Sequence, residues 1–278
     1  MPSTAELLDL AIDAAHAAGA LLRAEYARAS RVATVSTKSS ATDPVTAADH
    51  ASEELIVARI DAARPHDGIL AEEATTRDSG TGITWIVDPL DGTANFVFNR
   101  AAFAVSIAAA DEAGSLVGVV YDPVLDETFR AARGGGAYLG ARRLHLPEDA
   151  EPIASSLVGT GFAYLAHRRA LQGALVAQIL PHIRDIRRVG AAALDLCAIG
   201  SGRLDAYFEA DLKPWDLAAG ALVCTEAGAR LEVLDGLVDV PTVVVAHPRA
   251  FEAFVTLLLG AREAAHERAN PGQRGATS

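Results

Sequence analysis

The sequence is poor in the features that mark secreted, membrane-spanning and nucleic-acid-binding proteins. It has 2 cysteines in 278 residues, at no metal-ligand or redox spacing, so we expect reduced thiols inside the core. No apolar run approaches the roughly 20 residues that span a bilayer, and acidic residues interrupt the N-terminal segment, unlike a signal peptide. Basic residues number 24 against 36 acidic ones, a formal net charge of -12 without an offsetting basic stripe. We therefore predict a cytoplasmic protein that binds neither a membrane nor nucleic acid directly.

The motifs of several common enzyme classes are missing as well. The chain has no GxxxxGK[ST], GxSxG or HExxH segment, so P-loop, serine-hydrolase and zincin chemistry lack their usual markers. Its glycine clusters at 134–136 and 159–161 lack the third glycine of a dinucleotide-binding loop. The 8 histidines are scattered without ligand spacing. The carboxylates are therefore the groups in which to look for chemistry.

The chain has enough apolar residues for a sizeable core, because 50% are hydrophobic and 22% are charged. From residue 103 to 146, short β-rich runs separated by turn signals predict an antiparallel sheet. Farther on, strand and helix patterns alternate, which is typical of an α/β arrangement. We divide the chain into an α+β half (residues 1–150), an α/β half (residues 151–262) and a polar tail (residues 263–278) expected to be disordered.

Capping signals predict where two helices of the first half begin. Ser3 and Glu6 have the spacing of a capping box ahead of apolar residues at helical intervals. Thr46 and Asp49 are suited to cap a second helix, which alone would explain both residues. A last helix is expected over residues 248–262.

The segment from Trp85 to Phe96, WIVDPLDGTANF, sets two carboxylates at the end of an apolar run. Its first residues predict a short buried strand, which Pro89 should end because proline cannot donate to a sheet ladder. Asp88 and Asp91 would repel each other there unless one keeps its proton or a cation lies between them. Mg²⁺ prefers such oxygen ligands, and the free N–H groups of the turn that begins at Gly92 suit a phosphate. The alternative interpretation is an acidic β-turn after a core strand.

Two separated segments resemble the signatures of the inositol monophosphatase family. Asp88 to Thr93, DPLDGT, is similar to the family's D-P-[IL]-D-G-[ST] signature. Trp215 to Ala229, WDLAAGALVCTEAGA, is similar to W-D-x-A-A-G-x-x-x-x-x-E-A-G-G, with alanine as the last residue. The family belongs to the lithium-sensitive, Mg²⁺-dependent phosphomonoesterases, which include fructose-1,6-bisphosphatases.

Shorter matches extend this resemblance from about Lys38 to the last helix. Glu72 and Glu73 are similar to the family's G-E-E motif, with alanine in place of the glycine. A further segment of the family is matched by Lys38, Asp43, Val45, Thr46 and Asp49. We favour a functional role for Asp49 over capping alone, because the other signatures accompany it.

The resemblance implies a role for each matching residue. The implied metal ligands are Glu72, Asp88, the Leu90 carbonyl, Asp91, Asp216 and, for a weaker third ion, Asp49. The implied catalytic residues, which activate a water molecule, are Asp49, Thr93 and Glu72. Phosphate would be bound by the amides of Gly92 and Thr93, and the rest of the substrate by Ala192, Glu209 and Asp216. Two or three Mg²⁺ ions per site would serve as cofactors, and Li⁺ would inhibit.

The implied fold is a layered α-β-α-β-α sandwich, which combines α+β and α/β elements as in fructose-1,6-bisphosphatases and usually forms a homodimer. The implied enzyme is a phosphoric monoester hydrolase that uses Mg²⁺ to hydrolyse a small phosphorylated substrate, with inositol 1-phosphate as the first candidate. Histidinol phosphate, fructose 1,6-bisphosphate and 3′-phosphoadenosine 5′-phosphate stay open, because residues 98–100 depart from the histidine, glycine and proline often found there. Some bacterial relatives also bind the transcription machinery, so a regulatory protein partner is the rival function.

Overall fold

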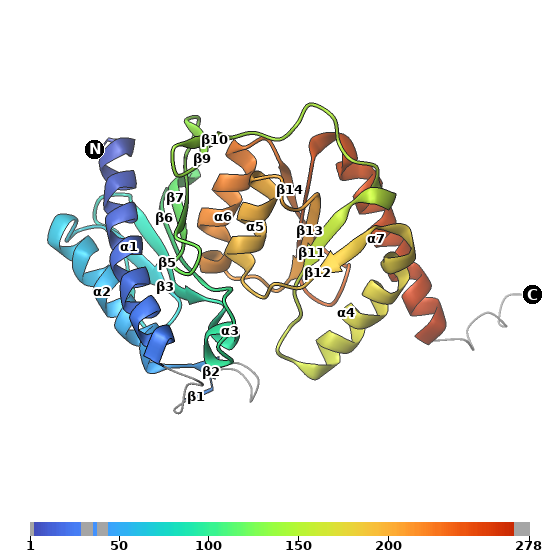
Figure 1. The fold of residues 1–278 in the computed structure, drawn as a ribbon, viewed down its shortest axis with the longest axis horizontal. Coiled ribbons are helices and arrows are strands. Elements are labelled where there is room, and N and C mark those ends of the chain that lie inside the picture. Colours follow the sequence, from blue (N-terminus) through green and yellow to red (C-terminus); the bar gives the residue numbers. More distant parts are fainter. Residues whose placement is uncertain (1–2, 29–35, 38–43, 270–278) are drawn as a thin grey trace, which may run out of the picture.

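The computed structural model describes residues 3–28, 36–37 and 44–269 of the chain. In these residues, layers of helices alternate with layers of β-sheet (Figure 1). The arrangement confirms the α-β-α-β-α sandwich that the resemblance implied. Lys38 and Asp43 lie outside the described residues, so their match to the family stays a sequence observation.

The first sheet is covered on its outer face by α1 (Thr4–Arg28) and α2 (Ala47–Ala63). Within the described residues it has eight strands, in the order β10 (Arg142–Leu144), β9 (Gly136–Leu139), β8 (Glu127–Ala132), β7 (Gly114–Asp122), β6 (Ala104–Asp111), β5 (Thr84–Asp91), β3 (Gly68–Ala71) and β4 (Thr76–Arg77). Strands β5 to β10 pair antiparallel with their neighbours, as predicted from the β-rich runs, whereas β3 and β5 are parallel. A separate antiparallel pair is formed by β1 (Ser36–Thr37) and β2 (Pro44–Val45).

The second sheet contains strands from the later part of the chain. Its order in the described residues is β12 (Asp185–Arg187), β11 (Leu157–Thr160), β13 (Ala206–Ala210), β15 (Thr242–Ala246) and β14 (Arg230–Leu234). Strand β11 is parallel to β12 and β13, and the remaining pairs are antiparallel. Helices α5 (Ala192–Gly200) and α6 (Pro214–Glu226) lie between the two sheets and contact strands of both (Figure 1).

The outermost layer consists of α4 (Ala166–Ile179) and α7 (Pro248–Ala269), which contact each other. Short helical segments complete the described chain: α3 (Thr93–Val97), η1 (Ile153–Ser155) and η2 (Leu180–His182). Helix α7 continues to Ala269, beyond the expected end at residue 262, so the first part of the predicted disordered tail is helical. The sequence there, EAAHERA, is rich in good helix formers and has no proline or glycine to stop the helix.

Strand β5 does not end at Pro89, in contrast to the sequence prediction. Asp88 pairs with Ser106 and Asp91 pairs with Ala104, so three steps along β5 match two along β6. The extra residue forms a bulge, which accommodates a proline that has no N–H to donate. The strand therefore delivers both aspartates to the end of the sheet.

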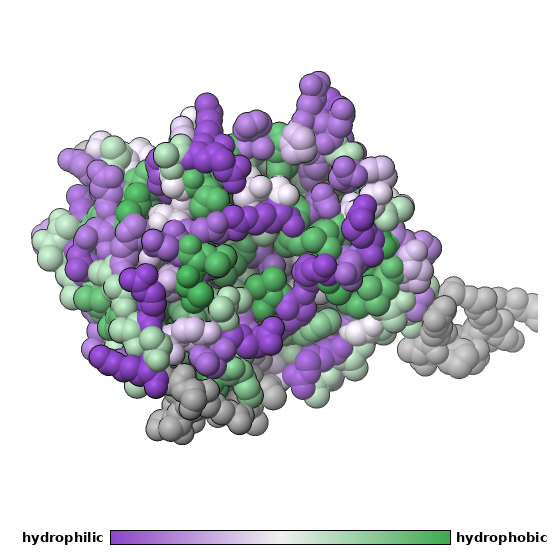
Figure 2. All heavy atoms as spheres, viewed as in Figure 1, coloured by the Kyte–Doolittle hydropathy of each residue, from purple (hydrophilic) through white to green (hydrophobic). Residues whose placement is uncertain are grey.

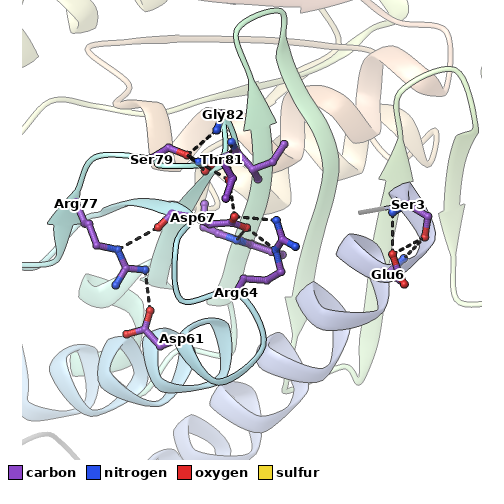
Figure 3. Close-up of polar contacts among 11 residues, drawn as sticks. Ser3, Glu6, Asp61, Arg64, Asp67, Arg77, Ser79, Thr81 and Gly82 are labelled. Atoms are coloured by element: carbon purple, nitrogen blue, oxygen red, sulfur yellow. Dashed lines mark hydrogen bonds and ion pairs between the residues drawn. The ribbon is translucent and has the colours of Figure 1, made fainter. Parts of the chain in front are cut away.

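Helix α1 begins at a capping box and packs closely against the first sheet. The capping box predicted at its start is present, since Ser3 and Glu6 exchange hydrogen bonds of 2.8 to 3.2 Å (Figure 3). Gly19 allows close contact, because a Cβ there would lie 2.5 Å from the Tyr121 ring. Cys197 and Cys224 are buried free thiols in the middle layer, as expected.

On the face drawn in Figure 2, green hydrophobic patches are separated by purple hydrophilic side chains. No helix among the described residues is long and apolar enough to cross a membrane.

A buried carboxylate joins α2 to the first sheet. Asp67 is fully buried and receives two hydrogen bonds of 2.8 Å from the Arg64 guanidinium. The Thr81 hydroxyl donates at 2.6 Å and the Trp85 indole N–H at 3.0 Å. Figure 3 shows Asp67 between Arg64 and Thr81, with the ion pair of Arg77 and Asp61 beside them. The network holds the start of β3 in place beside the strand that carries the candidate site.

We expect Asp67→Asn to lower the free energy of unfolding by about 3 kcal/mol at pH 7, because Arg64 loses its charged partner at a buried site. Urea denaturation followed by circular dichroism measures this difference. Burial raises the pKa of Asp67, but the hydrogen bonds from Arg64, Thr81 and Trp85 outweigh it and hold the pKa below its ordinary value. The carboxylate therefore stabilises the fold near neutral pH, and this contribution disappears as the pH falls below about 4. Equal stability of variant and wild type at pH 7 would contradict the assignment.

Candidate active site

A cavity of about 640 Å³ lies between the segment after β5, the loop after β11 and the segment that joins β13 to α6. Its lining includes most of the residues that the sequence singled out: Glu72, Asp88, Leu90, Asp91, Gly92, Thr93, Ala192, Glu209 and Asp216. Residues from both halves of the chain therefore meet at one place. Asp49 is buried and does not line the cavity, but it contacts a residue that does.

The bulge in β5 explains how two aspartates three residues apart reach the same cavity. In a regular strand, residues three apart point to opposite faces of the sheet. The bulge breaks this alternation between Asp88 and Asp91, and both line the cavity. The Leu90 N–H donates to Asp88 Oδ1 at 3.0 Å, which closes the turn.

Gly92 makes the sharp change of direction from β5 into α3. Its φ of 90° lies in the left-handed region, which residues with a Cβ seldom adopt. A Cβ at this position would also lie 2.8 Å from the Ala102 carbonyl oxygen. Glycine is thus required for both conformation and space, and the turn places Thr93 at the start of α3.

Asp49 caps α2, as its position predicted, and it also contacts Thr93 in the cavity lining. Its Oδ2 accepts hydrogen bonds from the Thr46 N–H at 2.8 Å and from the Thr46 hydroxyl at 2.6 Å, which caps α2. Its Oδ1 accepts a hydrogen bond of 2.9 Å from the Thr93 hydroxyl. The same hydroxyl lies 3.0 Å from the Leu90 carbonyl oxygen. Asp49 therefore fixes the position of the Thr93 oxygen from behind the cavity wall.

Asp91 joins the two halves of the chain. Its Oδ1 accepts a hydrogen bond from the Ala192 N–H at 3.1 Å, and its Oδ2 accepts one from the Ala193 N–H at 2.8 Å. These are free N–H groups at the first turn of α5, which favour a negative charge. The sequence assigned Ala192 to substrate recognition, and in this structure its N–H is occupied by Asp91.

Burial, together with the charges of neighbouring carboxylates, raises the pKa values of three aspartates in the cavity lining. Burial raises the pKa of Asp88 well above its ordinary value, and the neighbouring Glu72, Asp91 and Asp216 add to the shift. Burial also raises the pKa of Asp91 to about 7, although the N–H groups of α5 oppose this. The pKa of Asp216 is raised well above its usual range for the same main reason, burial. Cations or protons are needed to hold such a group of acids together.

The residues fit a hard divalent cation by their chemistry. Carboxylate and carbonyl oxygens are the ligands that Mg²⁺ selects, and this cavity offers several. In the part of the chain that the structure describes, no group of three or more His, Cys, Asp or Glu side chains could hold a metal ion as it stands. The carboxylate side chains would therefore have to move closer to one another to bind a cation.

The second half contributes acids that are held by their own neighbours. Asp216 Oδ2 accepts a hydrogen bond of 2.7 Å from the Lys213 N–H, so it caps α6 as well as lining the cavity. Glu209 accepts a hydrogen bond of 2.5 Å from the Tyr207 hydroxyl. A Cβ at Gly161 would lie 1.8 Å from Glu209 Oε1, so the glycine makes room for the carboxylate.

Three cationic side chains in the cavity lining were missed by the sequence interpretation: Arg168, Arg188 and Lys213. Arg168 forms an ion pair with Asp211, whose other oxygen lies 2.7 Å from Lys213 Nζ. Arg188 lies close to Gly190, where a Cβ would lie 2.0 Å from its Nη1. The sequence offered only a weak signal for Arg188, as part of a short basic cluster, and none for Arg168, which is 43 residues from its partner.

The chain is similar to known proteins over most of its length. The sequence profile of the Inositol monophosphatase family matches residues 3–270. An inositol-1-monophosphatase of Mycobacterium leprae is 44% identical over 208 residues, which cover 72% of this chain and 71% of that protein. A Nus factor SuhB of Pasteurella multocida is 41% identical over 224 residues, 80% of this chain and 83% of that protein. The solved structure of Mycobacterium tuberculosis SuhB has a TM-score of 0.79 at 36% identity, covering 93% of this chain and 98% of that chain.

Proposed function

Because the chain belongs to the inositol monophosphatase family of phosphoric monoester hydrolases, we propose that it uses Mg²⁺ to hydrolyse inositol 1-phosphate. The observation that carries this proposal is the group of buried or half-buried carboxylates in one cavity, Glu72, Asp88, Asp91 and Asp216, beside the Gly92 turn. Burial raises the pKa values of Asp88, Asp91 and Asp216, which indicates that the cavity favours a positive charge beside them. Bound metal ions would supply this positive charge, and they would also attract the negatively charged phosphate of an ester substrate.

The proposed metal ligands are the carboxylates of Glu72, Asp88, Asp91 and Asp216 with the Leu90 carbonyl. Bound Mg²⁺ would acidify a water molecule and neutralise charge on the phosphate and the leaving oxygen. Asp49 was also implied as a ligand of a weaker third ion. Its hydrogen bonds to Thr46 and Thr93 favour an orienting role instead.

Thr93 is the residue proposed to orient the attacking water, and its hydroxyl would accept a proton from that water as it passes its own proton to Asp49. Its hydroxyl has two acceptors nearby, Asp49 Oδ1 at 2.9 Å and the Leu90 oxygen at 3.0 Å, and it has one proton to donate. When it donates to Asp49, its oxygen could still accept a hydrogen bond from a water molecule. The amides of Gly92 and Thr93 would hold phosphate oxygens in line for the attack.

The substrate assignment rests on the second half of the lining. Glu209 and Asp216 offer carboxylate oxygens to the hydroxyl groups of a polyol, and Arg188 adds a donor beside them. A cyclic polyol phosphate matches this mixture of acceptors and donors. The name of the Mycobacterium leprae relative supports the same substrate.

The test is phosphate release from inositol 1-phosphate, histidinol phosphate, fructose 1,6-bisphosphate and 3′-phosphoadenosine 5′-phosphate at a fixed Mg²⁺ concentration. We expect the largest kcat/KM with inositol 1-phosphate and inhibition by Li⁺. A larger kcat/KM for another ester would keep the metal chemistry and overturn the substrate assignment. Release from none of the four esters would contradict the proposed function. Size-exclusion chromatography of the same sample tests the proposed homodimer.

A second candidate function is binding to the transcription machinery, which the name of the Pasteurella multocida relative favours. This role would need a surface rather than the carboxylate cavity. Asp88→Asn separates the two functions, because it removes a proposed metal ligand inside the cavity and leaves the surface unchanged. Loss of turnover with retained binding to RNA polymerase would support both roles as separate functions.

A further inference from the structure

Helix α2 directs buried polar side chains toward the segments that carry the proposed ligands. Asp49 holds the Thr93 hydroxyl, as described above. Ser52 Oγ donates a hydrogen bond of 2.8 Å to the Pro89 carbonyl, within the β5 bulge. Glu53 follows on the same helix and is 4% exposed. Its carboxylate has no part in the reaction proposed so far.

The Glu53 carboxylate binds a loop of the backbone. Its Oε2 accepts a hydrogen bond of 2.9 Å from the Glu73 N–H. Its Oε1 accepts from the N–H groups of Ala74 at 3.1 Å and Thr75 at 3.0 Å, and from the Thr75 hydroxyl at 2.8 Å. Hydrogen bonds to an ionised acceptor are roughly twice as strong as those between neutral groups. One side chain thus fixes the direction of three successive N–H groups.

This loop begins at Glu72, which lines the cavity. The Glu72 N–H donates to the Val87 carbonyl at 3.1 Å, one residue before Asp88. The Ala71 N–H donates to the Thr75 carbonyl at 2.9 Å and closes the loop. The backbone of Glu72 is therefore held on one side by β5 and on the other by the loop that Glu53 binds.

We propose that Glu53 is a positioning residue, whose carboxylate fixes the loop that presents Glu72 to a cation in the cavity. The inference rests on the proposed function, because it takes Glu72 as a metal ligand. Groups that orient a metal ligand change the metal affinity about 10- to 100-fold when they are removed. Glu53 itself contacts neither the cavity nor the reacting groups.

The variant Glu53→Gln tests the proposal with little change of shape. A glutamine that places its oxygen at the Oε1 position still accepts from Ala74 and Thr75. Its NH₂ group then faces the Glu73 N–H, so two donors meet next to Glu72. We expect the amide of Glu73 to exchange its hydrogen faster and Mg²⁺ affinity, measured by isothermal titration calorimetry, to fall about 10-fold.

Glu54→Gln is the matched control. It removes the same charge one residue farther along α2, from an exposed side chain. We expect its Mg²⁺ affinity and the exchange of residues 73–75 to equal those of the wild type. A similar loss of affinity in both variants would show a general effect of charge and overturn the proposal.

Thr75→Val weakens the same contact by changing the loop, and it leaves the sequence of α2 unchanged. It removes one of the hydrogen bonds to Glu53, so we expect a smaller loss of Mg²⁺ affinity in the same direction. Both variants could instead have lower melting temperatures and unchanged Mg²⁺ affinity. That result would show that Glu53 only stabilises the fold, and it would overturn the proposal. Because calorimetry needs no turnover, it decides this point even if the wild type releases no phosphate, a result that would contradict the proposed function separately.

Discussion

Asp88→Asn is expected to lower kcat for phosphate release on the order of 10³-fold. Asp88 is one of the proposed Mg²⁺ ligands, and its side chain is buried near Glu72, Asp91 and Asp216. Asparagine keeps the shape and one oxygen, but it removes the charge. Steady-state phosphate release at saturating substrate, over a series of Mg²⁺ concentrations, measures the effect.

The melting temperature of this variant shows whether a loss of turnover comes from the removed ligand or from unfolding of the protein. Burial and the neighbouring carboxylates raise the pKa of Asp88, so without a bound cation its charged form is disfavoured. A neutral asparagine in its place should then leave the melting temperature unchanged or slightly higher. Asp78→Asn, on an exposed loop residue, is the control and should match the wild type in both measurements. Full Mg²⁺-dependent turnover by Asp88→Asn would overturn the metal assignment.

Thr93→Val is expected to lower kcat about 10²- to 10⁴-fold, the range typical of a lost general acid–base group. Valine has nearly the same shape as threonine, but it cannot hold a water molecule or donate to Asp49. The two hydrogen bonds from Thr46 to Asp49 remain, so the cap of α2 should persist. Measurement of kcat and KM separately should place the loss in kcat.

Thr93→Ser is the rescue variant, because it restores a hydroxyl at the same position. We expect it to recover most of the turnover that Thr93→Val loses. If Thr93→Val retained wild-type kcat, or if serine failed to restore turnover, Thr93 would not orient the water. A loss confined to KM would instead indicate that Thr93 acts only through phosphate binding.

Much of the candidate site could be predicted from the sequence, because its residues lie in short, continuous segments. DPLDGT carries two carboxylates, a backbone carbonyl and a glycine turn within six residues. Local rules were sufficient to foresee the turn at Gly92 and its use at the start of a helix. They also identified the capping box of Thr46 and Asp49 at the start of α2, which the structure confirms.

The contacts that assemble these segments could not be predicted from local rules. Asp91 binds the first turn of α5 about 100 residues away in the chain, and Glu53 binds the loop at residues 73–75. Neither pair of residues is separated by a helix or strand repeat, so no local sequence pattern identifies the partner. The strand end at Pro89 was wrong for a related reason, since the bulge depends on pairing with β6. The layered fold itself came from the resemblance to the family rather than from the patterns of single elements.

If the carboxylate cavity works by binding Mg²⁺, the rate of phosphate release must follow the Mg²⁺ concentration. The wild-type chain is stripped of metal with a chelator, and phosphate release from inositol 1-phosphate is followed as Mg²⁺ is returned. We expect no release above background before Mg²⁺ is added and a saturable rise afterwards, which Asp88→Asn does not show. Release by the stripped wild type at the full rate, unchanged by Mg²⁺, would contradict the account.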